Sequence, residues 1–310
     1  MPSSRQRLSG MAGVFIAAAL WGTTGTAATY APDLSPLAVG AVAMGIGGLL
    51  QGLIAIAAII RQRRLISRHR HFLLTGAVAV AVYPLAFYAS MRYAGVTVGT
   101  VISIGSAPLL SALIEYRLDG LRLTKQWMCG AAVGIAGMIL LCLAESGGRG
   151  TCNDHATTGI LLGLLAGFTY ACYSWSARRL MQAGVASRAA MGATFGAGGI
   201  LLMPVLLMTG APLLAAWNNT AVGIYMALVP MFVGYVCYGY GLARIPASMA
   251  TTITLLEPVV AALLAVILVG ERLPASGWAG VGLIVACLVV ISVPAGMRPF
   301  APAKRRADSI

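Results

Sequence analysis

The 310-residue chain holds 59% apolar and only 9% charged residues, with a mean hydropathy of +0.87. Soluble domains contain about 25% charged residues, so this composition excludes a soluble globular protein and indicates an integral membrane protein. The net charge of +13 would suggest nucleic acid in a soluble chain, but the basic residues cluster between apolar runs, so we expect membrane orientation and no nucleic-acid binding.

The first apolar run follows Arg5 and Arg7 and continues to about Tyr30, which is long enough to span a membrane as an uncleaved helix. Runs of comparable length follow at 36–60, 72–92, 96–116, 125–144, 157–180, 188–210, 217–242, 247–269 and 275–294. Each can cross about 30 Å of hydrocarbon as a helix. The sequence therefore predicts an all-α polytopic membrane protein with ten transmembrane helices.

The basic residues predict the orientation of these helices. With the N-terminus in the cytoplasm, 18 of the 21 Lys and Arg residues lie on the cytoplasmic side, and only Arg92, Arg149 and Arg272 lie outside. Positive residues accumulate on the cytoplasmic side of membrane proteins. We therefore expect both termini to be cytoplasmic.

One segment of the chain occurs twice. Residues 255–273, LLEPVVAALLAVILVGERL, match residues 105–123, GSAPLLSALIEYRLDGLRL, at an offset of 150, which aligns Pro258 with Pro108. Each copy contains five predicted helices, an odd number, so the second copy must enter the membrane from the opposite side. We predict an inverted repeat of residues 1–150 and 151–296, followed by a cytoplasmic tail at 297–310; secondary transporters use such repeats for alternating access.

Cysteine and histidine residues suggest no further chemistry. The six cysteines lie in apolar runs except for Cys152, so no disulfide framework follows, and no Cys/His spacing is typical of a metal site. His69, His71 and His155 fall in predicted loops. We expect no metal and no cofactor.

Glu257 is the acidic residue that falls in the middle of a predicted span, whereas Glu115 and Asp119 are expected at the inner surface. A charged carboxylate at that depth is costly, so it should be protonated, paired or facing a wet cavity. We interpret it as a coupling or gating residue; the alternative is a neutral Glu bonded to backbone that Pro258 frees. Because Ala107 occupies the matching position, such a site would be single.

Aromatic and small polar residues at membrane depth form a second candidate set. Tyr and Trp normally gather at the interfaces because their polar atoms need partners, so we expect a shared lining from Trp21, Tyr83, Tyr88, Tyr170, Tyr173, Trp175, Tyr235, Tyr238 and Tyr240. The alternative is that each tyrosine is a core residue bonded to a nearby carbonyl. The predicted substrate contacts are Trp21, Thr26, Tyr83, Tyr88, Ser103, Tyr170, Trp175, Tyr235, Tyr238 and Thr254. Pro84, Pro108 and Pro258 are candidate hinges or structural kinks.

The ALWG at 19–22 and the twin segments APLLSALIEYRLDGLRL at 107–123 and EPVVAALLAVILVGERL at 257–273 resemble the drug/metabolite transporter superfamily, EamA type. The length and the tyrosine-rich third, sixth and eighth helices resemble its YddG-type aromatic amino acid exporters. The resemblance implies a bacterial inner-membrane exporter with a central cavity lined by the first, third, fourth, sixth, eighth and ninth helices. The first copy departs from the second because Ala107, not an acidic residue, precedes its proline. The resemblance therefore does not support a coupling scheme with one acidic residue in each half.

We therefore expect an exporter of amino acids, including aromatic ones, and similar amphipathic metabolites, rather than an enzyme. It would be embedded in the lipid bilayer as a monomer or weak homodimer, because glycine faces such as Gly159, Gly163 and Gly167 serve either helix packing within a chain or dimerisation. An uncoupled facilitator of the same fold is the alternative. A membrane enzyme acting on lipid-linked substrates is a remote one, since no His/Asp, Ser/His or paired-carboxylate set lies at one depth.

Overall fold

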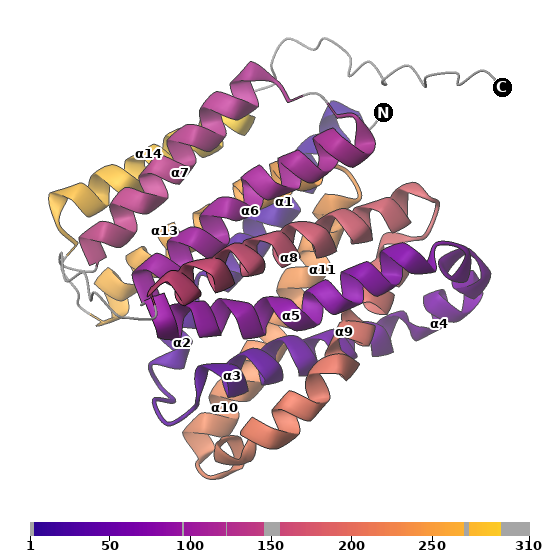
Figure 1. Cartoon of the computed structure of the whole chain (residues 1–310), viewed down its shortest axis with the longest axis horizontal. Coiled ribbons are helices and arrows are strands. Elements are labelled where there is room, and N and C mark those ends of the chain that lie inside the picture. The colour runs from indigo at the N-terminus through magenta and orange to yellow at the C-terminus, as the bar shows by residue number, and fades with distance from the viewer. Residues whose placement is uncertain (1–2, 95, 122, 146–155, 270–272, 293–310) are drawn as a thin grey trace.

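A computed structural model describes residues 3–94, 96–121, 123–145, 156–269 and 273–292 (Figure 1). All regular elements among these residues are helices. The predicted tail at 297–310 and His155 lie outside the described residues.

The first half of the chain forms α1 (Ser4–Trp21), α2 (Thr24–Ala28), α3 (Pro36–Gly40), the π-helical η1 (Ala41–Ile46), α4 (Gly47–Arg68), α5 (Arg70–Ala94), α6 (Val96–Asp119) and α7 (Lys125–Glu145). The second half forms α8 (Ala156–Gln182), α9 (Ser187–Thr209), the short 3₁₀ helix η2 (Ala211–Leu214), α10 (Trp217–Met226), the π-helical η3 (Ala227–Val233), α11 (Gly234–Leu242), α12 (Ala247–Ile253), α13 (Leu256–Leu264), the π-helical η4 (Ala265–Val269) and α14 (Ala275–Ser292).

The predicted spans correspond to the helices that the structure contains. Within the described residues, nine helical segments are long and apolar enough to cross a membrane, and the shorter apolar stretch Lys125–Leu141 lies where the fifth span is expected. One boundary differs from the prediction. The basic residues at 61–70, after the second span, lie in helices, because α4 ends at Arg68 and α5 begins at Arg70. The prediction that His71 lies in a loop is therefore wrong. Arg and Gln favour helix, which lets both helices continue past the apolar window.

The helices pack in a pattern that two related halves require. Between the halves, α5 packs against α8, and the matching helices α11 and α1 pack in the same way. Likewise α6 packs against α8, and α12 and α13 pack against α1. The pairs α4–α9 and α7–α14 each join matching helices of the two halves and run side by side in Figure 1. Exchanging the halves therefore converts every one of these pairs into another or into itself.

Glycines allow the matching helices to approach closely. A Cβ atom on Gly52 of α4 would lie 3.2 Å from the Cα of Gly196 on α9. A Cβ on Gly280 of α14 would lie 2.6 Å from the carbonyl oxygen of Gly137 on α7. Small residues at such contacts let helices associate in lipid, and here these glycines serve contacts within the chain.

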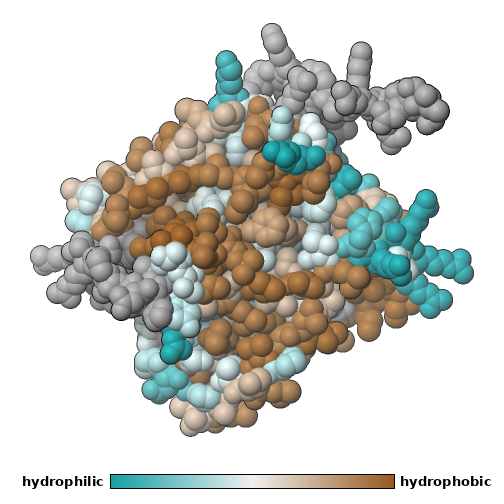
Figure 2. Space-filling model, in the orientation of Figure 1, coloured by the Kyte–Doolittle hydropathy of each residue, from teal (hydrophilic) through white to brown (hydrophobic). Residues whose placement is uncertain are grey.

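The outer surface is apolar along the helices. Figure 2 shows a brown surface over the helices in view and hydrophilic side chains gathered at the end where α4 meets α5. Leu207 and Leu214, for example, are exposed by 84% and 85%. Exposed apolar surface of this extent is expected for helices that contact lipid acyl chains.

Candidate functional site

Two transmembrane segments that the sequence predicts as continuous are broken at the same place. Turns separate α1 from α2 at Gly22 and Thr23, and α12 from α13 at Thr254 and Leu255. Pro258 explains the second break, because proline lacks an N–H and its ring clashes with the carbonyl four residues earlier. The two breaks touch, since a Cβ on Gly22 would lie 2.7 Å from the carbonyl oxygen of Glu257.

Hydroxyl groups satisfy the backbone at the first break. The Thr23 hydroxyl donates to the Leu20 carbonyl oxygen at 2.6 Å, and the Thr24 hydroxyl donates to the Trp21 carbonyl oxygen at 2.7 Å. Broken helices at membrane depth persist only where other groups compensate the lost backbone bonds or where they face a cavity. In transporters, such breaks commonly line the binding site.

Trp21, at the end of α1, is held by a carbonyl of the π-helical η3. Its indole N–H donates to the Pro230 carbonyl oxygen at 2.9 Å. Its ring centroid lies 4.7 Å from that of Tyr235 and 5.2 Å from that of Tyr238. The first half thus supplies a ring to an aromatic cluster from the second half.

Four of the tyrosine hydroxyls near this cluster form hydrogen bonds with other side chains. Tyr170 donates to Thr254 Oγ1 at 3.0 Å, the Tyr173 and Tyr235 hydroxyls are 2.8 Å apart, and Tyr238 is 2.8 Å from Ser174 Oγ. These partners are hydroxyls rather than the backbone carbonyls that the alternative interpretation assumes. The bonds join α8 to α11 and to the second helix break.

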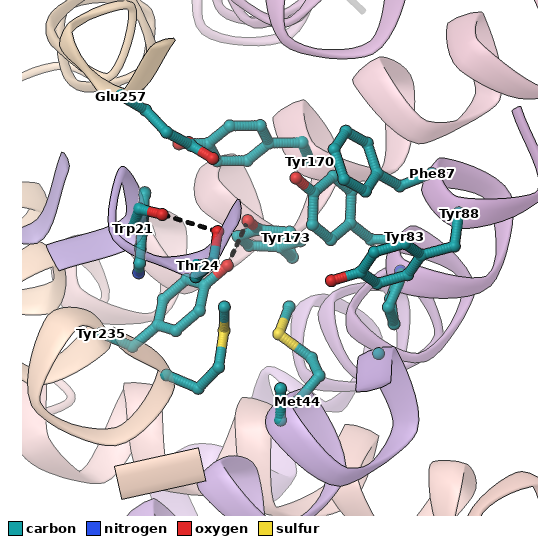
Figure 3. Close-up of a pocket in the computed structure, with 14 residues that line it drawn as sticks. Trp21, Thr24, Met44, Tyr83, Phe87, Tyr88, Tyr170, Tyr173, Tyr235 and Glu257 are labelled. Carbon is teal, nitrogen blue, oxygen red and sulfur yellow. Dashed lines mark hydrogen bonds between the residues drawn. The ribbon is translucent and has the colours of Figure 1, made fainter. Parts of the chain in front are cut away.

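A cavity of ≈ 50 Å³ lies between the halves at the helix breaks. Its lining residues, all drawn as sticks in Figure 3, are Trp21, Thr24, Gly40, Ala43, Met44, Tyr83, Pro84, Phe87, Tyr88, Tyr170, Tyr173, Met231, Tyr235 and Glu257. The space is enough for a few water molecules, which need about 10–15 Å³ each on this measure. It is well below the roughly 300–1,000 Å³ of sites that hold organic ligands, so the cavity must widen to take a substrate.

The cavity brings together Trp21, Tyr83, Tyr88, Tyr170, Tyr235 and Glu257 from the predicted site, as well as the predicted hinge Pro84. Tyr238 and Thr254 lie behind it: both are fully buried, and they bond Ser174 and Tyr170. They support lining residues without lining the cavity themselves.

Other predicted residues also lie outside the lining. Trp175 is five residues beyond Tyr170 on α8, which turns it to another side of the helix, and its indole N–H donates to Asp119 Oδ2 at 3.0 Å. Ser103 is fully buried in α6, Thr26 lies in the short α2, and Pro108 lies within α6, which continues past it unbroken.

Several lining residues have no signal in the sequence. Met44 and Met231 are apolar residues in apolar spans, and each lies on a π-helical segment. Phe87 and Ala43 are equally ordinary in composition. A π-helical segment shifts the helix face that follows it, so helical periodicity alone could not have indicated them.

At the end of the helices that the sequence assigns to the inner surface, the side chain of Glu115 is buried. Its side chain, on α6, is 2% exposed and accepts hydrogen bonds from the backbone N–H of Ala247 at 2.7 Å and of Ser248 at 3.1 Å. The Ser248 hydroxyl also donates to it. These donors form the first turn of α12, where the helix dipole favours a negative charge. Glu115 therefore ties the first half to the second at the end assigned to the cytoplasm.

A second link at that end comes from α8. Arg178 Nε lies 3.9 Å from Glu115 Oε1, and its guanidinium donates to the Leu242 carbonyl oxygen at 2.7 Å and to that of Ile245. Arg179 Nε lies 3.4 Å from Asp119 Oδ1. We call Glu115, Arg178 and the start of α12 the cytoplasmic latch. It joins α6, α8 and α12 and closes this end below the cavity.

No group of three His, Cys, Asp or Glu side chains that could hold a metal ion occurs in the described part of the chain. The arrangement can bind a small molecule between two sets of helices and hold it away from one side of the membrane. A duplicated bundle of apolar spans with such a cavity at its helix breaks is characteristic of a membrane transporter.

Comparison with known families identifies the transporter family to which the chain belongs. The EamA-like transporter family model matches residues 8–143 and 157–293, which together cover most of the chain. The chain belongs to the EamA-like transporter family, which confirms the resemblance to that family and accounts for its duplicated halves. This is a family of multi-pass membrane transporters, not of enzymes.

Individual relatives agree with this assignment. The chain is 33% identical over 280 residues to the uncharacterized transporter YwfM of Bacillus subtilis, covering 90% of this chain and 92% of the relative. It is 26% identical to a probable terminal-alkyne amino-acid exporter of Streptantibioticus cattleyicolor, covering 88% and 93%. A solved crystal structure has the same fold, with a TM-score of 0.76, 20% identity and coverage of 93% and 96%.

Proposed function

We propose that the protein exports amino acids, including aromatic ones, and similar small amphipathic metabolites from the bacterial cytoplasm across the inner membrane. The observation that carries this proposal is the aromatic cavity between the halves, where both broken helices meet. Rings from α1, α5, α8 and α11 offer apolar faces, while hydroxyls and one carboxylate offer polar contacts. Such a lining suits a substrate with both an apolar body and a polar end.

The relative from Streptantibioticus cattleyicolor, named a probable amino-acid exporter, supports the amino-acid class. The likeness to the YddG-type exporters remains part of the proposal, and the aromatic lining favours it because aromatic rings gain from edge-to-face contact with one another. We propose the same boundaries as above for the two repeats, 1–150 and 151–296. The pairwise packing of matching helices supports them.

Transport would proceed by alternating access. In this structure the cytoplasmic latch is closed and the cavity is too small for a substrate. Loading from the cytoplasm would require the contact between α6 and α12 to separate, and Pro84 and Pro258 are the proposed hinges on the cavity wall and at the second break. Glu257 would couple transport to protons or gate the cavity.

Counterflow in proteoliposomes tests this function. Vesicles loaded with an unlabelled amino acid should accumulate the same labelled amino acid from outside, with aromatic amino acids more active than acidic ones. A variant with Trp21→Ala should lose most of this activity, because the ring contacts three tyrosines of the cavity region. Absence of counterflow for every amino acid in the panel would reject the proposal.

The role of Glu257 is tested separately in the same vesicles. Glu257→Gln keeps the shape of the side chain and removes its charge, so it should abolish stimulation of transport by a pH gradient. A wild-type protein whose transport ignores the gradient would favour the uncoupled facilitator instead.

A further inference from the structure

Three polar groups in the cavity wall have no hydrogen-bond or ion-pair partner in the part of the chain that the structure describes. Among the described residues, no hydrogen bond or ion pair joins the carboxylate of Glu257, the hydroxyl of Tyr83 or the hydroxyl of Tyr88 to another group, whereas Tyr170, Tyr173 and Tyr235 are already bonded. Unpartnered polar groups at this depth are costly. Because these groups lie in the wall of a cavity, a ligand or water there can form the hydrogen bonds that the protein does not supply.

These groups come from opposite sides of the cavity. Figure 3 shows the Glu257 carboxylate extending from α13 and the Tyr83 and Tyr88 hydroxyls pointing from α5 toward the same space. The ring of Tyr170 lies next to that of Tyr83, with centroids 5.5 Å apart. The wall thus offers a negative acceptor at one end and two neutral donors at the other.

The charges of the lining are unbalanced. Glu257 is its single ionisable acid, and it contains no Lys, Arg or His side chain. A carboxylate away from water is stabilised by an opposite charge, and the faces of Trp and Tyr also attract cations. Since the described lining provides no cation, the substrate is the available source.

We infer that the substrate's protonated amine binds at Glu257 and that Tyr83 and Tyr88 donate to an oxygen at its other end. The inference rests on the proposed export function and narrows it to amine-bearing substrates. Because the two tyrosines are neutral, they can donate to a carboxylate, an amide or an ester oxygen. Selectivity therefore depends on the amine, and a free carboxylate is not required.

A competitor series tests the inference in the wild-type protein. Counterflow of labelled phenylalanine is measured against phenylalaninamide and phenethylamine, which keep the amine, and N-acetylphenylalanine, which lacks the positive charge. Phenylalaninamide should compete within a few-fold of phenylalanine, and phenethylamine should compete more weakly than phenylalaninamide because it has no oxygen for the two tyrosines. N-acetylphenylalanine should be at least about tenfold weaker, the loss expected for one charged hydrogen bond.

Equal competition by N-acetylphenylalanine would overturn the inference while leaving the export function in place. Absence of counterflow for all amino acids would instead reject the export function. In that case the same compounds are compared by thermal stabilisation of the purified protein. Stabilisation by phenethylamine but not by N-acetylphenylalanine would still support the amine site, and the reverse order would overturn it.

Matched variants assign the two ends. Glu257→Gln should weaken competition by phenethylamine at least about tenfold. The control Asp33→Asn, which removes a carboxylate from an exposed turn, should leave that competition unchanged. Tyr83→Phe and Tyr88→Phe should weaken competition by phenylalaninamide. They should not change competition by phenethylamine, which has no oxygen to accept the tyrosine hydroxyls. Should a variant fail to fold, the wild-type competitor series decides; an unchanged phenethylamine affinity in folded Glu257→Gln would contradict the inference.

Discussion

Trp21 is the residue through which the two halves meet at the cavity. It is 4% exposed, its N–H is bonded to the Pro230 carbonyl, and its ring contacts tyrosines of α8 and α11. Since α1 belongs to the first half and its partners belong to the second, a change at Trp21 should affect both the stability of the bundle and the shape of the cavity.

We predict that Trp21→Phe lowers the free energy of unfolding by about 1–3 kcal/mol, because it leaves a buried carbonyl without its donor. Thermal unfolding in detergent measures the change. Trp217→Phe is the control, since Trp217 is 77% exposed and its replacement should alter stability little. Equal effects of the two substitutions would show that the bond to Pro230 does not contribute.

Single residues were predictable from the sequence where chemistry made them unusual. Glu257 and the tyrosines stand out in an apolar chain, and the structure brings Glu257 and five of the predicted substrate contacts to one cavity. Glu115 could not be assigned in this way, because it lies near the end of a span and is buried only by the start of α12. That contact joins residues 132 positions apart, which no local pattern reports.

The latch illustrates how a helix end contributes at the level of elements. The first two N–H groups of α12 have no partner within the helix, and Glu115 of α6 accepts both. The contact is strong because a full charge accepts the bonds. It would have to break if α6 and α12 separate during transport.

We predict that Glu115→Gln increases the hydrogen-exchange rate of the Ala247 and Ser248 amides by about tenfold, as a charged acceptor becomes a neutral one. Mass spectrometry of a peptide covering 243–253 measures this, and a peptide from α14 provides the unchanged reference. If both peptides keep their wild-type rates, the carboxylate does not hold this end closed.

Helix contacts give a second test at this scale. A Cβ on Gly280 would lie 2.6 Å from the Leu141 nitrogen, whereas a Cβ on Gly282, two residues further on α14, meets nothing within 4 Å. We predict that Gly280→Ala destabilises the protein by about 1–3 kcal/mol, while Gly282→Ala is neutral or slightly stabilising. Thermal unfolding of both variants, compared side by side, decides; equal unfolding temperatures would contradict the packing of α7 on α14.

Spans were predictable to within a few residues because hydrocarbon thickness fixes their length. The basic residues at 61–70 mark a membrane boundary in the sequence. They do not end the helices, because Arg favours helix in water as well. The breaks at Gly22 and Thr254 were harder to predict. Pro258 predicts a distortion at the second break, but its position next to the first break, at Gly22, joins residues far apart in the sequence.

At the scale of the whole molecule, the duplication was visible in the sequence because one offset aligned the two proline segments. The pairing of α4 with α9 and of α7 with α14 follows from the relation between the halves. The volume of the cavity did not follow, since it depends on how the aromatic rings pack. In this structure the volume is ≈ 50 Å³, so the cavity has to widen during transport.

The most direct test of alternating access is the accessibility of one cavity position from each side of the membrane. Thr24→Cys places a thiol in the lining, in a chain whose six native cysteines are replaced by alanine or serine. A membrane-impermeant maleimide is then applied to right-side-out and to inverted vesicles. We predict labelling from both sides, and protection from both sides by a transported amino acid. Labelling from only one side, or labelling that no substrate slows, would contradict a single cavity that opens alternately.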